Sequence, residues 1–224
     1  MKISKYGITL SLLRQQDIEF VSQKFYPMDE IPSDESAENT PGNVQEWIDS
    51  IYTFKNFYYI IEYKGVKIGM INDKVLDWKS RTSVIDLLFW DESYMDSVAP
   101  MLTLLCLLET GFHYLNWNEY KTIVSQNDSK RISILKSLGF VLQKGNNPDQ
   151  EYLLSREHFE TKATKVLEEA REYIDVALGE GYMLLEAADY ETGVAQKIEY
   201  HITESGIYLY RRGISGGRKY SMVG

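Results

Sequence analysis

Three acidic residues near the middle of the chain could supply a general base. Asp86 is the only charged residue in the apolar stretch 83–90, and Asp91 and Glu92 follow directly after its end. A carboxylate on or beside an apolar strand can accept a proton from a reacting group such as an amine. Two other interpretations stay open. Asp86 can be a buried carboxylate bound by backbone groups or by an arginine such as Arg81. Asp91 and Glu92 can be loop charges that cap the next helix.

A second polar group lies further along the chain. Asn127, Asp128, Lys130 and Arg131 fall between a strand-like stretch, YKTIVSQ, and a helical one, SKRISILKSLGF. Lysine and arginine pair well with phosphate, and a helix start offers free N–H groups to an anion. We therefore predict that these four residues contact an acidic cofactor. The alternative is a solvated first helical turn with Asp128 as its N-cap.

The pattern that connects the two groups is typical of a crossover unit. The strand-like residues 83–90 are followed by a loop, by the apolar helical stretch 99–115 and by a second strand over 120–126. Such a connection makes the two strands parallel and places the helix on one face of the sheet. We predict that the strands splay apart near 88–90 and 124–127, where their unpaired backbone groups can hold an extended amide ligand.

Three segments resemble one protein family. Residues 126–140, QNDSKRISILKSLGF, resemble the closing helix of the GNAT superfamily, the acyl-CoA-dependent N-acetyltransferases. Residues 58–90 are similar to the family's central hairpin and core strand, with the turn EYKGVKIG, and residues 6–23 to its opening strand and helix. The resemblance covers roughly residues 5–158.

This resemblance implies an α/β fold, with a mixed α+β sheet of about six or seven strands and helices on both faces. It also implies transfer of acetyl from acetyl-CoA to a primary amine of a small molecule, an amino sugar or a peptide. The backbone of Leu88, Phe89 and Trp90 would then hold the cofactor, and Val98 and Ala99 would lie at its pyrophosphate.

The chain departs from the family's pattern in two places. The family's pyrophosphate loop contains glycines, whereas residues 95–100 contain none and include Asp96. Glycine lets backbone approach phosphate closely, and the Asp96 carboxylate would repel it. The family's usual thiolate-protonating tyrosine is replaced by Leu135, which leaves Tyr94 and Tyr114 as alternatives. The glycine-free loop favours a second hypothesis, a catalytically silent domain of this fold that binds a partner and has lost CoA binding. A third hypothesis is a domain that binds another acyl carrier or a nucleotide in the same cleft.

Composition argues against several classes of function. The formal net charge of −9 is unfavourable for binding nucleic acid or an anionic membrane. The apolar run 99–108 is shorter than the roughly 20 residues that cross a bilayer. Cys106 is the single cysteine, and among leucines it is predicted to be a core residue rather than a catalytic thiol. The three histidines have no metal-site spacing. Without a signal-peptide pattern, we expect a cytoplasmic protein.

The last part of the chain lies outside the resemblance. We predict a GNAT-like domain over 1–158 and an extension of a helix plus a β-hairpin over 159–224. The stretches GYMLLEAADY, AQKIEYHIT and GIYLYRR are expected to be strands, and the glycine-rich tail after Gly213 to be frayed. Their alternating aromatic residues predict packing on the first domain or on a second copy, as a homodimer. The acidic loop 27–43 is expected to be a solvated connection, and the alternative that the resemblance implies is that it edges the amine site.

Overall fold

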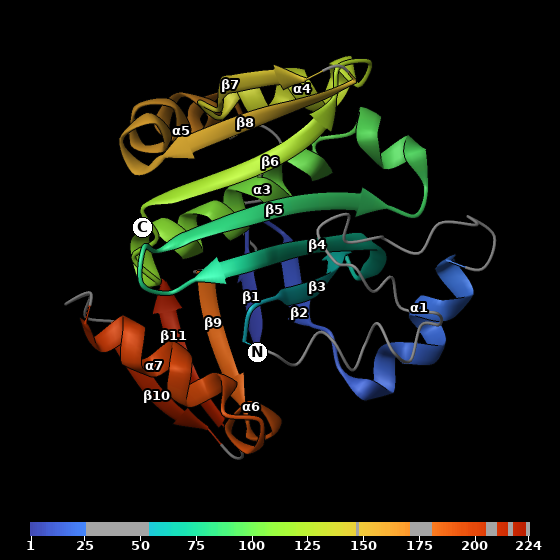
Figure 1. Ribbon diagram of the computed structural model, residues 1–224. Helices are drawn as coiled ribbons and strands as arrows, with labels where there is room; N and C mark the ends of the chain where they lie inside the picture. Colours follow the sequence, from blue (N-terminus) through green and yellow to red (C-terminus); the bar gives the residue numbers. More distant parts are fainter. Residues whose placement is uncertain (26–53, 147, 171–180, 205–209, 215–216, 223–224) are drawn as a thin grey trace.

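Figure 1 shows the computed structural model, which describes residues 1–25, 54–146, 148–170, 181–204, 210–214 and 217–222. These residues form one curved sheet of eleven strands with helices packed against it. The predicted acidic loop 27–43 lies outside the described residues. Among the described helices, none is long and apolar enough to cross a membrane.

The elements follow one another along the chain in a strand-rich order. The strands are β1 (Lys2–Lys5), β2 (Ile8–Leu12), β3 (Phe57–Tyr63), β4 (Val66–Asp77), β5 (Thr82–Phe89), β6 (Glu119–Ser125), β7 (Val141–Asn146), β8 (Asp149–Ser155), β9 (Gly181–Glu186), β10 (Tyr210–Ile214) and β11 (Gly217–Met222). The α-helices are α1 (Ile18–Phe25), α3 (Ala99–Glu109), α4 (Ser129–Ser137), α5 (Arg156–Ala170), α6 (Ala187–Glu191) and α7 (Val194–Glu204). Short helical turns are η1 (Gln15–Asp17), η2 (Glu92–Asp96) and the π-helical η3 (Thr110–Tyr114).

The strand order across the sheet is β10-β11-β9-β1-β2-β3-β4-β5-β6-β8-β7. Among the described strands, β5 and β6 form the one parallel pair, and the helix α3 connects them as the sequence predicted. The mixed α/β fold is therefore confirmed. The sheet is larger than the six or seven strands expected, because β1 and the three C-terminal strands also join it.

The sheet is buried on both faces near its centre. In β5, Ile85, Leu87 and Phe89 are buried in the main core beneath α3. The opposite face of β3 to β5 forms a smaller core with α1, in which Phe20 packs edge-on against Trp90 at 5.1 Å between ring centroids. Asp86 shares this second face with Leu88 and Trp90, as the alternation predicted.

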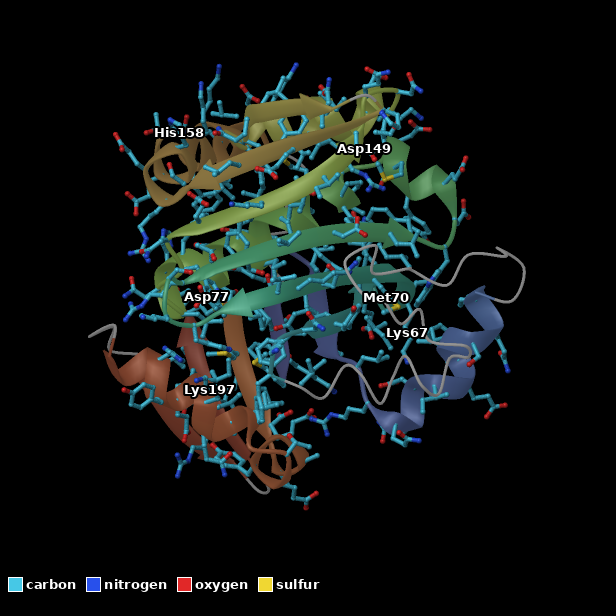
Figure 2. All side chains as sticks on the ribbon, viewed as in Figure 1. Lys67, Met70, Asp77, Asp149, His158 and Lys197 are labelled. Atoms are coloured by element: carbon cyan, nitrogen blue, oxygen red, sulfur yellow. The ribbon has the colours of Figure 1, made fainter. Side chains whose placement is uncertain are left out.

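The hairpin of β3 and β4 aligns the central strands. Lys64 and Gly65 both have positive φ, which makes the two-residue turn that the sequence predicted. The predicted irregularity at Gly69 is also present. The pairing shifts at this point, and a Cβ on Gly69 would lie 2.1 Å from the Leu88 carbonyl oxygen. β4 thus approaches the end of β5 closely at Gly69, which only glycine permits here. Figure 2 labels Lys67 and Asp77 near the opposite ends of this long strand.

Part of the secondary structure predicted for the extension is wrong. AQKIEYHIT lies in the helix α7, because Val194, Ile198 and Ile202 also fit a spacing of four residues and are all buried on one helical face. The run GYMLLEAADY is a strand only up to Glu186 and continues as α6. The tail is not frayed throughout, since residues 217–222 form β11 between β9 and β10.

The extension continues the sheet of the first part. β9 pairs antiparallel with β1, in the register Ile3↔Met183. Arg14 also donates to Glu186 at 2.7 Å and to Asp189 at 3.1 Å, so it joins the start of α6 to the end of β2. The proposed boundary at residue 158 falls inside α5, and the homodimer remains a prediction.

We predict that Asp73 makes the free energy of unfolding depend on pH. Its side chain is buried in β4 and accepts a 2.9 Å hydrogen bond from Ser83, and burial raises its pKa from 3.8 to about 7. The folded state therefore binds this proton more tightly than the unfolded state. Stability from this group should fall as pH rises from about 4 to 7, by up to about 1.4 kcal/mol per pH unit.

Asp73→Asn should therefore raise the melting temperature at pH 8 and change it little at pH 4. Thermal unfolding followed by circular dichroism at both values checks this. Asp149→Asn, at an exposed position at the start of β8, is the control and should show no such difference. An equal effect of Asp73→Asn at both pH values would contradict the assignment.

We further predict that a chain ending at Glu160 associates or precipitates. The truncation removes β9 and so leaves the edge of β1 and the core around Ile3 uncovered. Size-exclusion chromatography with light scattering would detect the association. A truncated chain that keeps the mass, solubility and melting temperature of the full chain would show that the extension contributes nothing to the core.

Candidate functional site

The candidate site lies where β5 and β6 separate. Their parallel ladder contains three residue pairs and ends at Val84↔Lys121, although β5 continues to Phe89 and β6 to Ser125. Figure 1 shows the two strands diverging toward their carboxyl ends. Over the same length β6 pairs fully with β8, from Glu119↔Ser155 to Ser125↔Asp149, and Asp149 is labelled in Figure 2. The predicted splaying of the two strands is confirmed.

The separation leaves one edge of β5 without a strand partner. The backbone N–H of Trp90 donates to the Ile68 carbonyl, and that of Asp86 to Asn72 Oδ1 at 3.0 Å, so both point toward β4. Because N–H groups alternate along a strand, that of Leu87 points toward β6, beyond the end of the ladder. It donates instead to Asp86 Oδ1 at 2.8 Å.

Asp86 therefore lies at the open edge, as a catalytic or cofactor-contacting residue would. Its side chain is 43% exposed rather than buried, and Arg131 rather than Arg81 is the arginine that binds it, at 3.3 Å between Nη1 and Oδ1. The alternative that Asp86 is bound by an arginine is thus confirmed, but the arginine is a different one and the carboxylate is not buried. The partner comes from α4, on the other side of the separation.

Arg131 is held between acids of two elements. Besides Asp86 on β5, it contacts Asp128, whose Oδ2 lies 3.3 Å from the arginine Nε. Asp128 is also the N-cap of α4, because its Oδ1 accepts the backbone N–H of Arg131 at 2.9 Å. The capping role left open by the sequence is confirmed for Asp128. Asn127 is exposed beside it, and its N–H donates to Ser125 Oγ.

Lys130 is paired with a carboxylate from the loop opposite. Its Nζ contacts Asp96 Oδ1, and this hydrogen bond raises the pKa of Lys130. The sequence assigned Lys130 to phosphate binding and Asp96 to phosphate repulsion. In the structure these two charges neutralise each other, so an incoming phosphate would compete with Asp96 for the lysine.

The start of α3 offers few donors to an anion. The Ala99 N–H donates to Ser97 Oγ at 3.1 Å, and Pro100 has no N–H. Val98 has φ −75°, a conformation open to any residue, and the Leu102 N–H donates to its carbonyl. Ser97 thus occupies a donor that the family's loop would give to pyrophosphate.

Asp91 and Glu92 behave as loop charges. Asp91 caps η2 by accepting the Ser93 N–H at 2.9 Å, and hydrogen bonds from the Ser93 side chain and backbone lower its pKa. A lowered pKa weakens a base, which argues against Asp91 in proton transfer. Glu92 is exposed on the same turn.

The Phe89 side chain is buried in the main core, and the Trp90 side chain packs against the smaller core on the other face of the sheet. Leu88 is half-buried on that second face, beside α1. Any contact of Phe89 and Trp90 with a cofactor would therefore come from their backbone. Tyr94 stacks on Phe89 with ring centroids 6.3 Å apart, close to the end of β5. Tyr114 is buried in the main core, where burial raises its pKa to about 12.

The remaining candidates have structural roles. Cys106 is fully buried, and burial raises the pKa of its thiol to about 12, so the core assignment is confirmed. Leu135, at the family's tyrosine position, is a buried residue of α4 itself. Among the described residues, no group of three or more histidine, cysteine, aspartate or glutamate side chains could hold a metal ion.

Comparison with known proteins places this geometry in a fold family. No protein-family model and no curated protein matches the sequence. Solved structures do match. RimJ of Mycobacterium smegmatis, in complex with CoA-disulfide, has a TM-score of 0.60 and 14% identity over 76% of this chain and 93% of its own. The dodecameric spermidine N-acetyltransferase of Vibrio cholerae has a TM-score of 0.58 and 14% identity over 69% and 97%. The chain therefore has the fold of the GNAT N-acetyltransferases.

Proposed function

We propose that this protein transfers the acetyl group of acetyl-CoA to a primary amine. The observation that carries the proposal is the separation of β5 from β6 after Val84, which leaves backbone groups of β5 without a strand partner at the centre of the sheet. An amide-containing chain such as pantetheine can pair with a free strand edge as a further strand would. The GNAT fold and the CoA-disulfide bound to RimJ support the same assignment.

In the proposed reaction the amine nitrogen attacks the thioester carbonyl, the C–N bond forms and the C–S bond breaks. Asp86 accepts the proton that the amine loses, because it is the acid located at the open edge. A free N–H of β5 stabilises the developing oxyanion. Tyr94 donates a proton to the leaving thiolate, since of the two candidate tyrosines it is the one beside the end of β5.

A cationic acceptor suits the surroundings of this edge. Asp86, Asp91 and Glu92 bring negative charge to the end of β5, and the chain carries a net charge of −9. The ring pair of Phe20 and Trp90 already accommodates primary ammonium groups, with Lys67 Nζ 4.6 Å from the Phe20 centroid. We propose an amine on a small molecule, an amino sugar or a peptide as the acceptor.

The second candidate is a silent domain of the same fold. Two contacts favour the silent domain. The Ala99 N–H at the start of α3 already donates to Ser97, and Lys130 is already paired with Asp96. Both features oppose tight binding of pyrophosphate. The two candidates differ in one measurable property, the release of free thiol from acetyl-CoA in the presence of amines.

We predict that the full-length protein releases CoA thiol when it is given acetyl-CoA and a mixture of primary amines. Asp86→Asn should lower the rate of acetyl transfer at saturating acetyl-CoA by about a hundredfold, the usual contribution of a general base. Asp149→Asn, the same acid-to-amide change at an exposed position of β8, is the matched control and should keep the wild-type rate. Thiol release that is equal in the wild type and in Asp86→Asn would exclude Asp86 as the base, and no release with any amine would favour the silent domain.

We also predict that CoA binds weakly and that Asp96 is a main cause. Replacing Asp96 and Val98 with glycine should tighten binding more than about tenfold, or about 1.4 kcal/mol. Most of this gain should come from Asp96, because its loss frees Lys130, whereas Val98 has an ordinary backbone conformation. Isothermal titration calorimetry with CoA measures it, and Asp96→Glu, which keeps the charge, is the matched control. Equal affinity in all variants would mean that this loop does not contact the phosphates.

A further inference from the structure

One ion pair crosses the separation between the two parallel strands. Arg131, in the first turn of α4 after β6, reaches Asp86 on β5, two residues beyond the last ladder pair. The guanidinium is three-quarters buried on the side-chain scale, at 25% exposure. Beyond the end of the β5–β6 ladder, this ion pair connects β5 with the start of α4, the helix that follows β6.

The guanidinium is incompletely satisfied by its two acids. Its Nη1 donates to Asp86 Oδ1 at 3.3 Å, a long hydrogen bond. Its Nε is buried and lies 3.3 Å from Asp128 Oδ2, but it has no hydrogen-bond partner of suitable geometry among the described residues. Arginine binds best to a group that accepts two parallel N–H bonds, as a phosphate does.

Asp86 is used twice in this arrangement. The same Oδ1 that contacts Arg131 accepts the Leu87 N–H, which points into the separation. The carboxylate therefore takes one strand donor that an amide carbonyl of a bound ligand would need. It also takes the cation that a ligand phosphate would need.

We propose that the Asp86–Arg131 pair is a latch, which a phosphate-bearing acyl carrier opens by replacing Asp86 as the partner of Arg131. This proposal rests on the proposed function and adds its regulation. Opening the latch releases the Leu87 N–H to the carrier and frees the Asp86 carboxylate to take a proton from the amine. The carboxylate is thus released from Arg131, and available as a base, only when the carrier is bound. The Lys130–Asp96 pair is more exposed and is a weaker contact of the same kind.

If the latch is closed in most molecules, only the open fraction can bind CoA, and the apparent affinity for CoA is reduced in proportion to that fraction. Asp86→Ala should therefore bind CoA about tenfold more tightly than the wild type, measured by calorimetry on the full chain. Asp86→Asn, which keeps an acceptor for the Leu87 N–H but loses the charge, should show a smaller gain. Asp149→Asn removes an exposed charge on β8, opposite Ser125, that has no role in the site, and it should change the affinity less than twofold.

Two further measurements separate the latch from a general charge effect. In the Arg131→Gln background, Asp86→Ala should give no gain, since the pair is already broken. In the Asp86→Ala protein without CoA, the Leu87 amide should exchange with solvent at least about tenfold faster than in the wild type, and CoA should slow it again.

The outcomes are distinguishable. If the wild type binds CoA but both Asp86 variants keep its affinity, or if Asp149→Asn gives an equal gain, the latch is overturned and the proposed function stands. If neither the wild type nor any variant binds CoA, the proposed function fails and the latch fails with it. Tighter binding that disappears with Arg131→Gln supports the latch.

Discussion

The early end of the β5–β6 ladder is the constraint on which the rest of the site depends. Each strand has two edges, and β6 uses one of them along its whole length for β8, while β5 follows β4 up to Phe89. The separation begins at Val84 and leaves backbone donors of β5 at the centre of the sheet, where an unpaired donor is costly unless something accepts it. A ligand or a side chain must therefore fill that role.

In the structure a side chain fills it. Asp86 binds the Leu87 N–H and the Arg131 guanidinium at once, so a single carboxylate compensates for missing ladder bonds and for a partly buried cation. The same principle explains the surrounding charges. Lys130 is neutralised by Asp96, and the start of α3 is capped by Ser97. The site is thus satisfied internally, and a polyanionic cofactor would have to replace these contacts rather than find them free.

Local patterns in the sequence predicted the parts of this arrangement that depend on neighbouring residues. The alternation in 83–90 predicted the correct faces of β5. The pair Lys64 and Gly65 predicted the hairpin turn, and Asp128 was correctly named as a possible cap of α4. The Asp86–Arg131 pair was missed because its two residues are 45 positions apart and meet only through the crossover. The helix α7 was predicted as a strand because Ile198, Tyr200 and Ile202 alternate with other residues, although Ile198 and Ile202 also fit a helical spacing of four. Only the packing, with Tyr200 exposed, decides between them.

The central claim is that the separation of β5 and β6 holds an acyl carrier. Its most direct test is a map of backbone amide chemical shifts during titration of the full-length protein with acetyl-CoA. The account predicts that the largest changes fall on residues 85–90 of β5, on residues 122–131 and on the side-chain Nε–H of Arg131, with β9 and β11 unaffected. Changes confined to the extension, or no change at millimolar acetyl-CoA, would contradict it.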